Sequence, residues 1–226
     1  MLLDFTCVFN VLTCSLTYQE KAMNSGFSVP NFMKVATLKN GVRVVLRPCV
    51  PGDRDRLLEF FRRLPQEDRL SLREDVTKVE TIERWLDIEG ASKISVVAET
   101  RERLIGDATL HMWPGGWHRH IGEIRLVTDV EFRGEGLGTI LAGELVSLAL
   151  QFNLDKLVAQ VMKDQKAVLM VLERLGFRKE AELRDHIMDL GGRKHDLVIM
   201  TNFVSVLWES LHDSEFYQVR LNHMED

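Results

Sequence analysis

Between residues 40 and 202, segments with the apolar pattern of strands alternate with segments that have the apolar pattern of helices. Short runs rich in β-branched residues and bounded by turn residues predict strands at 42–46, 94–98, 104–112, 120–128, 157–162, 181–189 and 196–200. Apolar residues spaced three and four apart predict helices at 53–64, 77–86, 136–152 and 165–175, and a further helix in the tail at 203–221. Asp53 can cap the first helix. Because strands and helices mix within one stretch, the pattern predicts an α/β or α+β domain with a mixed sheet.

Length and composition describe an ordinary globular chain. The 226 residues, 45% of them apolar and 28% charged, suit one domain. The net charge is −5, and because proteins that bind nucleic acid usually carry a basic surplus, we expect no nucleic-acid partner. No stretch reaches the roughly 18 uncharged apolar residues of a membrane span, so no membrane association is expected. Three cysteines without a CxxC pair predict neither a disulfide framework nor a zinc site, and we expect a cytoplasmic protein.

The charged residues are distributed unevenly. Within residues 1–33 they are Asp4, Glu20 and Lys21. We expect this segment to be a poorly ordered N-terminal extension, with the functional chain starting at Met23 or Met33. One domain is expected at 34–202. Residues 203–226 are expected to form a helical tail that packs on the sheet or on a second subunit, which would make the protein a homodimer.

The most informative stretch is the sequence RGEGLG at residues 133–138, between a predicted strand and a predicted helix. Glycines at every second position let the backbone approach a ligand closely. The helix that follows begins with unpaired amide N–H groups and the positive end of its dipole, so the turn is suited to bind phosphate. Arg133 adds a positive charge at the entrance. A close-packed strand-to-helix turn without a ligand is the alternative.

The spacing of these glycines argues against two other phosphate-binding motifs. A dinucleotide-binding GxGxxG fingerprint requires glycine at position 139, where this chain has threonine. A P-loop ends in GK[ST], and the turn lacks that ending. A nucleotide-binding module is therefore disfavoured.

Three motifs, in order along the chain, carry a family resemblance. The RGEGLG turn resembles the Arg-x-x-Gly-x-Gly acetyl-CoA-binding motif of the GNAT N-acetyltransferase superfamily. The sequence LERLGF at 172–177 resembles the end of the helix that follows the next strand in that superfamily. Residues 184–189, continued by Gly192, Asp196 and Met200, resemble the closing hairpin of many bacterial members. The resemblance covers about residues 40–202. It implies the GNAT fold, a central mixed, mostly antiparallel sheet of about six to seven strands flanked by helices.

The resemblance implies acetyl-CoA as the co-substrate and a surface that binds it. Backbone groups at the end of one strand would pair with the pantetheine arm, namely those of Leu126, Val127 and Thr128. Beside Arg133, backbone amides of the turn and of the first helical residues would bind the pyrophosphate, namely those of Gly134, Glu135, Gly136, Leu137, Gly138 and Thr139. Gln165 stands where the family often has asparagine, and its side chain can still form a hydrogen bond. No metal is expected, because His118 and His120 share a strand face but no third ligand can be named.

Acetyl transfer to an amine requires an unprotonated nitrogen, and an ammonium group has a pKa of about 10. Glu123 is the candidate general base, since some family members place a glutamate at a comparable point of this strand. The alternative is a surface carboxylate paired with Arg125 on the same strand face. Many members have a tyrosine that protonates the leaving thiolate, but the matching residue here is Leu172, which cannot donate a proton.

These residues lead to two hypotheses. The first is an N-acetyltransferase that uses acetyl-CoA to acetylate a primary amine by direct attack in a ternary complex. The amine could belong to a small molecule, a lysine or a protein N-terminus. The alternative is a catalytically weak or inactive sensor module that binds acyl-CoA, which the missing tyrosine favours. The acceptor is not readable from the sequence, and the net charge of −4 outside the first 33 residues favours a cationic amine only weakly.

Overall fold

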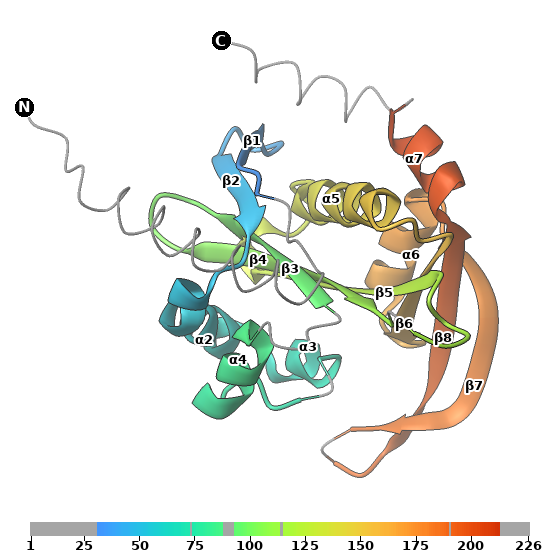
Figure 1. The fold of residues 1–226 in the computed structure, drawn as a ribbon. Helices are drawn as coiled ribbons and strands as arrows, with labels where there is room; N and C mark the ends of the chain where they lie inside the picture. The colour runs from blue at the N-terminus through green and yellow to red at the C-terminus, as the bar shows by residue number, and fades with distance from the viewer. Residues whose placement is uncertain (1–30, 73, 88–92, 114, 190, 213–226) are drawn as a thin grey trace, which may run out of the picture.

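The structure is a computed structural model that describes residues 31–72, 74–87, 93–113, 115–189 and 191–212 (Figure 1). The expectations for most of the N-terminal extension, including a start at Met23, lie outside the described residues. The end of the tail, 213–226, lies outside them too.

One sheet of eight strands forms the centre of the fold, in the order β1-β2-β3-β4-β5-β6-β8-β7 (Figure 1). The strands are β1 (Lys34–Thr37), β2 (Arg43–Pro48), β3 (Lys93–Glu99), β4 (Leu104–Met112), β5 (Ile121–Thr128), β6 (Lys156–Met162), β7 (Arg178–Met188) and β8 (Lys194–Phe203). Neighbouring strands are antiparallel, except that β5 and β6 are parallel. The mixed, mostly antiparallel sheet is confirmed, with one strand more than expected. The additional strand is β1, which is only four residues long.

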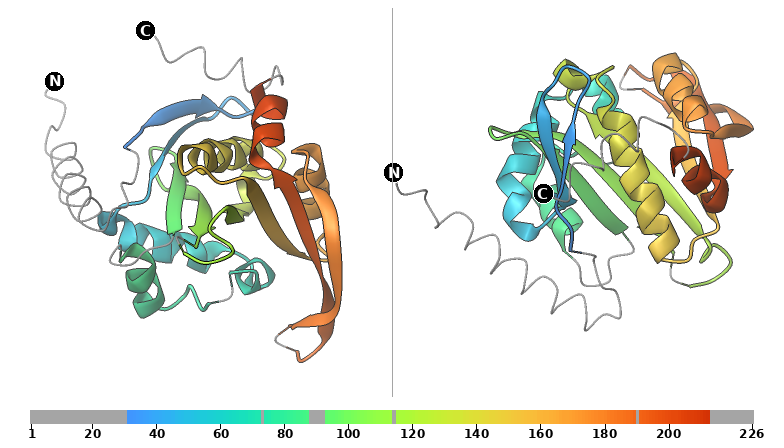
Figure 2. Two further views of the ribbon diagram at one scale, coloured as in Figure 1. Left: turned by 45° about the vertical axis from the view of Figure 1, so that its right-hand side comes forward. Right: turned by 90° about the horizontal axis from the view of Figure 1, so that it is seen from above.

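Helices cover both faces of the sheet. They are α2 (Arg54–Arg63), α3 (Gln66–Leu70), α4 (Val79–Leu86), α5 (Leu137–Gln151), α6 (Lys166–Arg174) and α7 (Val204–His212). Side chains of α2 and α4 pack into one buried cluster, and those of α5, α6 and α7 into another. The β7–β8 hairpin extends beyond the rest of the molecule (Figure 2). Within the described ranges, no helix is long and apolar enough to cross a membrane.

The two hydrophobic cores lie on opposite faces of the sheet. The first core lies under α5, and the second core lies under α2 and α4. Because side chains alternate along a strand, β5 contributes Ile124 to the first core and Val127 to the second. Odd-numbered residues of β5 therefore face α2 and α4. The first core also includes Val204 and Leu207 of α7, so the beginning of the expected tail packs on the body of the same chain.

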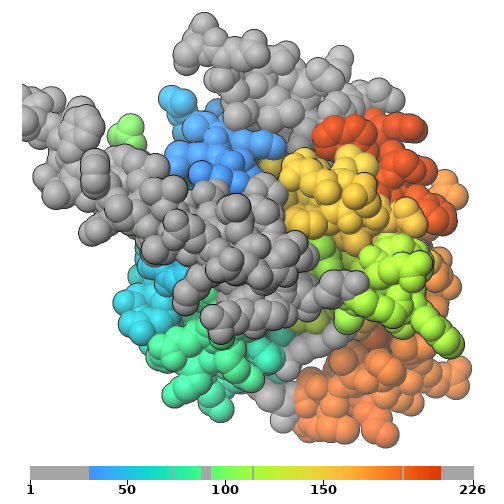
Figure 3. All heavy atoms as spheres, in the orientation of Figure 1, coloured from blue at the N-terminus to red at the C-terminus, as the bar shows by residue number. Residues whose placement is uncertain are grey.

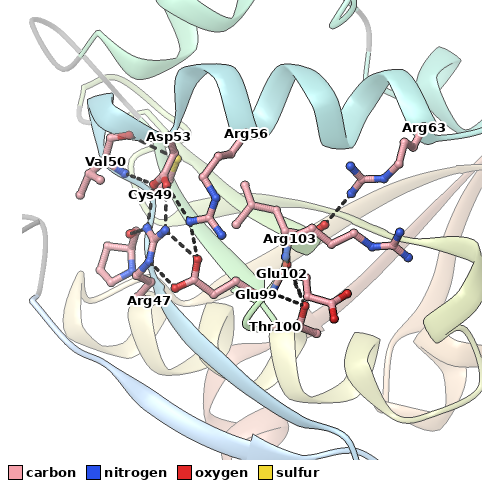
Figure 4. Close-up of polar contacts among 12 residues, drawn as sticks. Arg47, Cys49, Val50, Asp53, Arg56, Arg63, Glu99, Thr100, Glu102 and Arg103 are labelled. Carbon is pink, nitrogen blue, oxygen red and sulfur yellow. Dashed lines mark hydrogen bonds and ion pairs between the residues drawn. The ribbon is translucent and has the colours of Figure 1, made fainter. Parts of the chain in front are cut away.

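A buried ion cluster joins the start of α2 to the edge of the second core (Figure 4). The guanidinium of Arg47 donates to both carboxylate oxygens of Asp53, at 2.7 Å each. It also donates to both oxygens of Glu99, at 3.1 and 3.0 Å, and Arg56 of α2 donates to Glu99 at 2.6 Å. Asp53 is the N-cap residue of α2, as expected, but its side chain does not form the capping hydrogen bond. Among the described residues its side chain accepts hydrogen bonds from Arg47 and from the Val50 amide, but none from the first turn of α2.

Candidate active site

The sheet opens between β5 and β6. The two strands pair through Ile121, Gly122 and Glu123, which lie opposite residues 156–158. Beyond Glu123, β5 continues to Thr128 with β4 as its partner, while β6 continues to Met162 with β8 as its partner. Among the described residues, the β6-facing edge of β5 therefore lacks a strand partner along 124–128. The residues expected to bind the pantetheine arm, Leu126, Val127 and Thr128, all lie on this unpaired stretch.

The glycine turn follows directly on β5 and leads into α5. Gly134 has φ of 78° and Gly136 has φ of 89°, in the left-handed region that other residues adopt at a cost. Intrahelical bonding begins with the Ile140 amide, which donates to Gly136 at 3.1 Å. The amides of the preceding helical residues, Leu137, Gly138 and Thr139, are the ones that an α-helix leaves without intrahelical partners. The turn thus has the geometry of an anion site.

Two contacts hold this turn in place. The Lys39 amide, in the loop between β1 and β2, donates to the carbonyl of Glu135 at 3.1 Å. Arg133 forms an ion pair with Asp68 of α3, so its charge lies at the turn but already has a carboxylate partner. Gly138, unlike Gly136, has no positive φ, and a Cβ added there would touch Leu126 at an ordinary 3.6 Å.

Glu123 is buried on the face of β5 that is covered by α2 and α4. Arg125, two residues along the same face, donates to Glu123 Oε1 through Nε at 3.2 Å and through Nη2 at 3.1 Å. The same guanidinium approaches the carbonyl of Leu72 at 3.4 Å. The pairing that the sequence offered as an alternative is therefore present. It fixes the orientation of the Glu123 carboxylate beside the point where the strands separate.

A second polar group on this face is absent from the sequence-based expectations. Asp107 of β4 is buried, and its carboxylate accepts a hydrogen bond from the Thr109 hydroxyl at 3.2 Å. The hydroxyls of Thr109 and Ser95 lie 2.8 Å apart. Burial raises the pKa of Asp107 to about 7, although Thr109 and Lys93 oppose the shift. The available signal was a single carboxylate in the strand segment LIGDATLHM, where Thr109 and His111 are the other polar residues.

The remaining residues singled out from the sequence belong to the segment that follows β6. Gln165 directly precedes α6, which follows β6, and its amide donates to the carbonyl of Met162 at 2.9 Å. Leu172 of α6 is buried in the first core, so the position of the family's tyrosine is filled by an apolar side chain.

The loop between β4 and β5 lies at the surface next to α5 (Figure 3). Its Trp117 is 92% exposed, and the rings of Trp113 and His118 lie 6.4 Å apart. Among the described residues, no group of three or more His, Cys, Asp or Glu side chains could hold a metal ion. The loop therefore adds exposed aromatic surface at the end of β5 where β5 and β6 are paired.

Comparisons with known proteins agree with this geometry. A model of the acetyltransferase (GNAT) family matches residues 55–177. The GNAT-family acetyltransferase of Streptococcus pneumoniae is 21% identical, with a TM-score of 0.60 over 71% of this chain and 99% of that one. A putative acetyltransferase from Salmonella typhimurium, solved with its cofactor acetyl-CoA, is 18% identical, with a TM-score of 0.60 over 71% and 94%. A spermidine N-acetyltransferase chimera from Vibrio cholerae and hSSAT is 20% identical, with a TM-score of 0.61 over 73% and 97%. Because the family model covers more than half of the chain, the protein belongs to the acetyltransferase (GNAT) family.

Proposed function

We propose that the protein transfers the acetyl group of acetyl-CoA to a primary amine by direct attack in a ternary complex. The observation that carries this proposal is the separation of β5 from β6 beyond Glu123, with the glycine turn at the end of β5. An unpaired strand edge can pair with an extended arm, and open helical amides can bind a pyrophosphate. Membership of the family supports acetyl transfer from acetyl-CoA in general.

In this proposal, the backbone of Leu126, Val127 and Thr128 binds the pantetheine arm. The amides from Gly134 to Thr139 bind the pyrophosphate, and a phosphate there competes with Asp68 for the Arg133 guanidinium. Gln165 directly precedes α6, which follows β6 across the opening from β5, and in this proposal its side chain forms a hydrogen bond with the bound arm.

The proposed reaction needs one proton acceptor on the protein. Glu123 removes a proton from the acceptor ammonium, and the neutral nitrogen attacks the carbonyl carbon of the thioester. The new carbon–nitrogen bond forms as the carbon–sulfur bond breaks. The nitrogen loses its second proton to water as the amide forms, and water gives a proton to the thiolate, because Leu172 has none to give. Arg125 keeps the Glu123 carboxylate in one orientation throughout.

Substitution of Glu123 by glutamine tests this role. We expect Glu123→Gln to lower kcat by about 100-fold or more at neutral pH, since removal of a general base typically has that effect. The affinity for acetyl-CoA should change by no more than about twofold, because the proposed binding groups lie further along β5 and in the turn. Thiol release reports kcat, and calorimetry reports the affinity.

The matched control is Glu59→Gln, the same chemical change on the exposed face of α2. It should leave both measurements unchanged. A Glu123→Gln variant with the wild-type rate would remove Glu123 from the mechanism.

Leu172 supports a second candidate function, a sensor that binds acyl-CoA without turning it over. The two functions differ in one experiment, a thiol-release screen with acetyl-CoA against polyamines, amino acids, aminoglycosides and lysine peptides. An acetyltransferase releases thiol with at least one class of amine, and that class identifies the acceptor. A sensor binds acetyl-CoA tightly and releases no thiol with any of them.

A further inference from the structure

Lys93 lies on the same face of the sheet as the proposed base. In the register of the sheet, Lys93 of β3 lies opposite His111 of β4, and His111 lies opposite Glu123 of β5. Residues directly opposite each other share a face, so these three side chains form one row across three strands. Lys93 is therefore two strands away from Glu123, on the same face of the sheet.

The surroundings of Lys93 make its amine unusual. Its Nζ lies over the ring of Trp85 in α4, 5.0 Å from the centroid, and it forms no ion pair with the residues that the structure describes. Among the described residues, the charged groups that influence it are Glu74, Arg84, Asp107 and Arg125, which come from four different segments. The titratable His111 lies directly opposite it on β4. Burial is the largest influence and lowers the pKa of Lys93 to about 8, against the attraction of the two carboxylates.

A lowered pKa has a direct chemical consequence. At a pH of about 7.5, roughly a quarter of Lys93 side chains would be neutral, compared with about one in a thousand for an ordinary lysine. A neutral amine is the nucleophile that acetyl transfer requires. The fold therefore places a reactive amine on the same face of the sheet as the proposed base.

We propose that Lys93 is an internal acceptor, so that the protein acetylates its own side chain. This inference rests on the proposed function, because acetyl-CoA bound between β5 and β6 is the donor. Nζ attacks the carbonyl carbon of the thioester, the carbon–nitrogen bond forms and the carbon–sulfur bond breaks. The proton that the nitrogen loses balances the one that the thiol gains. Acetylation removes a charge that has no ion-pair partner among the described residues.

The experiment uses the full chain with acetyl-CoA and no added amine, and follows each lysine by peptide mass spectrometry. We expect Lys93 to acquire an acetyl group at least about tenfold faster than Lys78, which is 66% exposed at the start of α4. The rate at Lys93 should rise with pH around a midpoint of about 8, as the amine becomes neutral. Lys93→Arg should abolish the product while keeping the charge, and Lys78→Arg should leave it unchanged.

The outcomes separate this inference from the proposed function. Protein that acetylates an added amine but modifies Lys93 no faster than Lys78 overturns the inference alone. Protein that does not bind acetyl-CoA in calorimetry overturns both. The Gly136→Val variant, expected to lose acetyl-CoA binding, should lose the reaction at Lys93 but keep slow chemical acetylation of Lys78. Unchanged labelling of Lys93 in that variant would show a reaction with acetyl-CoA from solution and overturn the inference.

Discussion

Replacement of Arg47 by leucine is expected to lower the free energy of unfolding by about 3–5 kcal/mol. The Arg47 side chain is 9% exposed, and its partner Asp53 is 4% exposed. Without the guanidinium, Asp53 and Glu99 would keep two negative charges close together in a poorly hydrated place. Breaking a buried pair from one side is costly because Asp53 loses its close counterion and has little access to water. Arg56 replaces Arg47 only in part, since it lies 3.8 Å from Asp53 and already pairs with Glu99. Unfolding in urea, followed by circular dichroism, measures the loss.

The matched control is Arg54→Leu, the same substitution at the first residue of α2. Arg54 also forms two ion pairs, with Asp55 at 3.0 Å and Glu83 at 3.1 Å, but its side chain is 47% exposed. Water and salt screen such pairs, so we expect little change in stability. A second variant combines Arg47→Leu with Asp53→Asn and should regain part of the lost stability, because one uncompensated charge is removed. Equal losses for the Arg47 and Arg54 variants would contradict the argument that burial makes this cluster important.

The long strands and helices could be predicted because their periodicity is local. Strands β2 to β8 and helices α2, α4, α5 and α6 each contain enough residues for an apolar pattern to repeat. Strand β1 and helix α3, with four and five residues, are too short for such a pattern. The order of the strands depends on contacts between distant segments, so periodicity alone did not reveal where β5 and β6 would separate.

The features of the candidate site also divide into those set by neighbouring residues and those set by tertiary contacts. The glycine turn and the pairing of Glu123 with Arg125 were predictable, because both depend on residues that are neighbours in the sequence. Asp53 was assigned to a local cap, but a tertiary partner, Arg47, takes its carboxylate. The groups around Asp107 and Lys93 could not be predicted, since β3, β4, β5 and α4 bring them together only after folding.

Gly136→Val is expected to weaken acetyl-CoA binding by at least about 100-fold, which corresponds to roughly 3 kcal/mol. Gly136 has φ of 89° at the start of α5, and a β-branched residue is strained in this left-handed conformation. Relief of that strain rotates the peptide groups that precede α5, so the amides no longer point to a common centre. Calorimetric titration with acetyl-CoA measures the affinity directly.

Two further glycine variants separate loss of the site from loss of stability. Gly192→Val imposes similar strain, at φ of 80° in the β7–β8 hairpin, and has open space for the side chain. It should lower the melting temperature but leave acetyl-CoA affinity unchanged. Gly138→Val adds bulk in the first turn of α5 without left-handed strain, and should also weaken binding if the amides there contact the phosphates. Wild-type affinity in both the Gly136 and Gly138 variants would place the pyrophosphate elsewhere, because neither the direction of the amides nor the space in front of them would then matter.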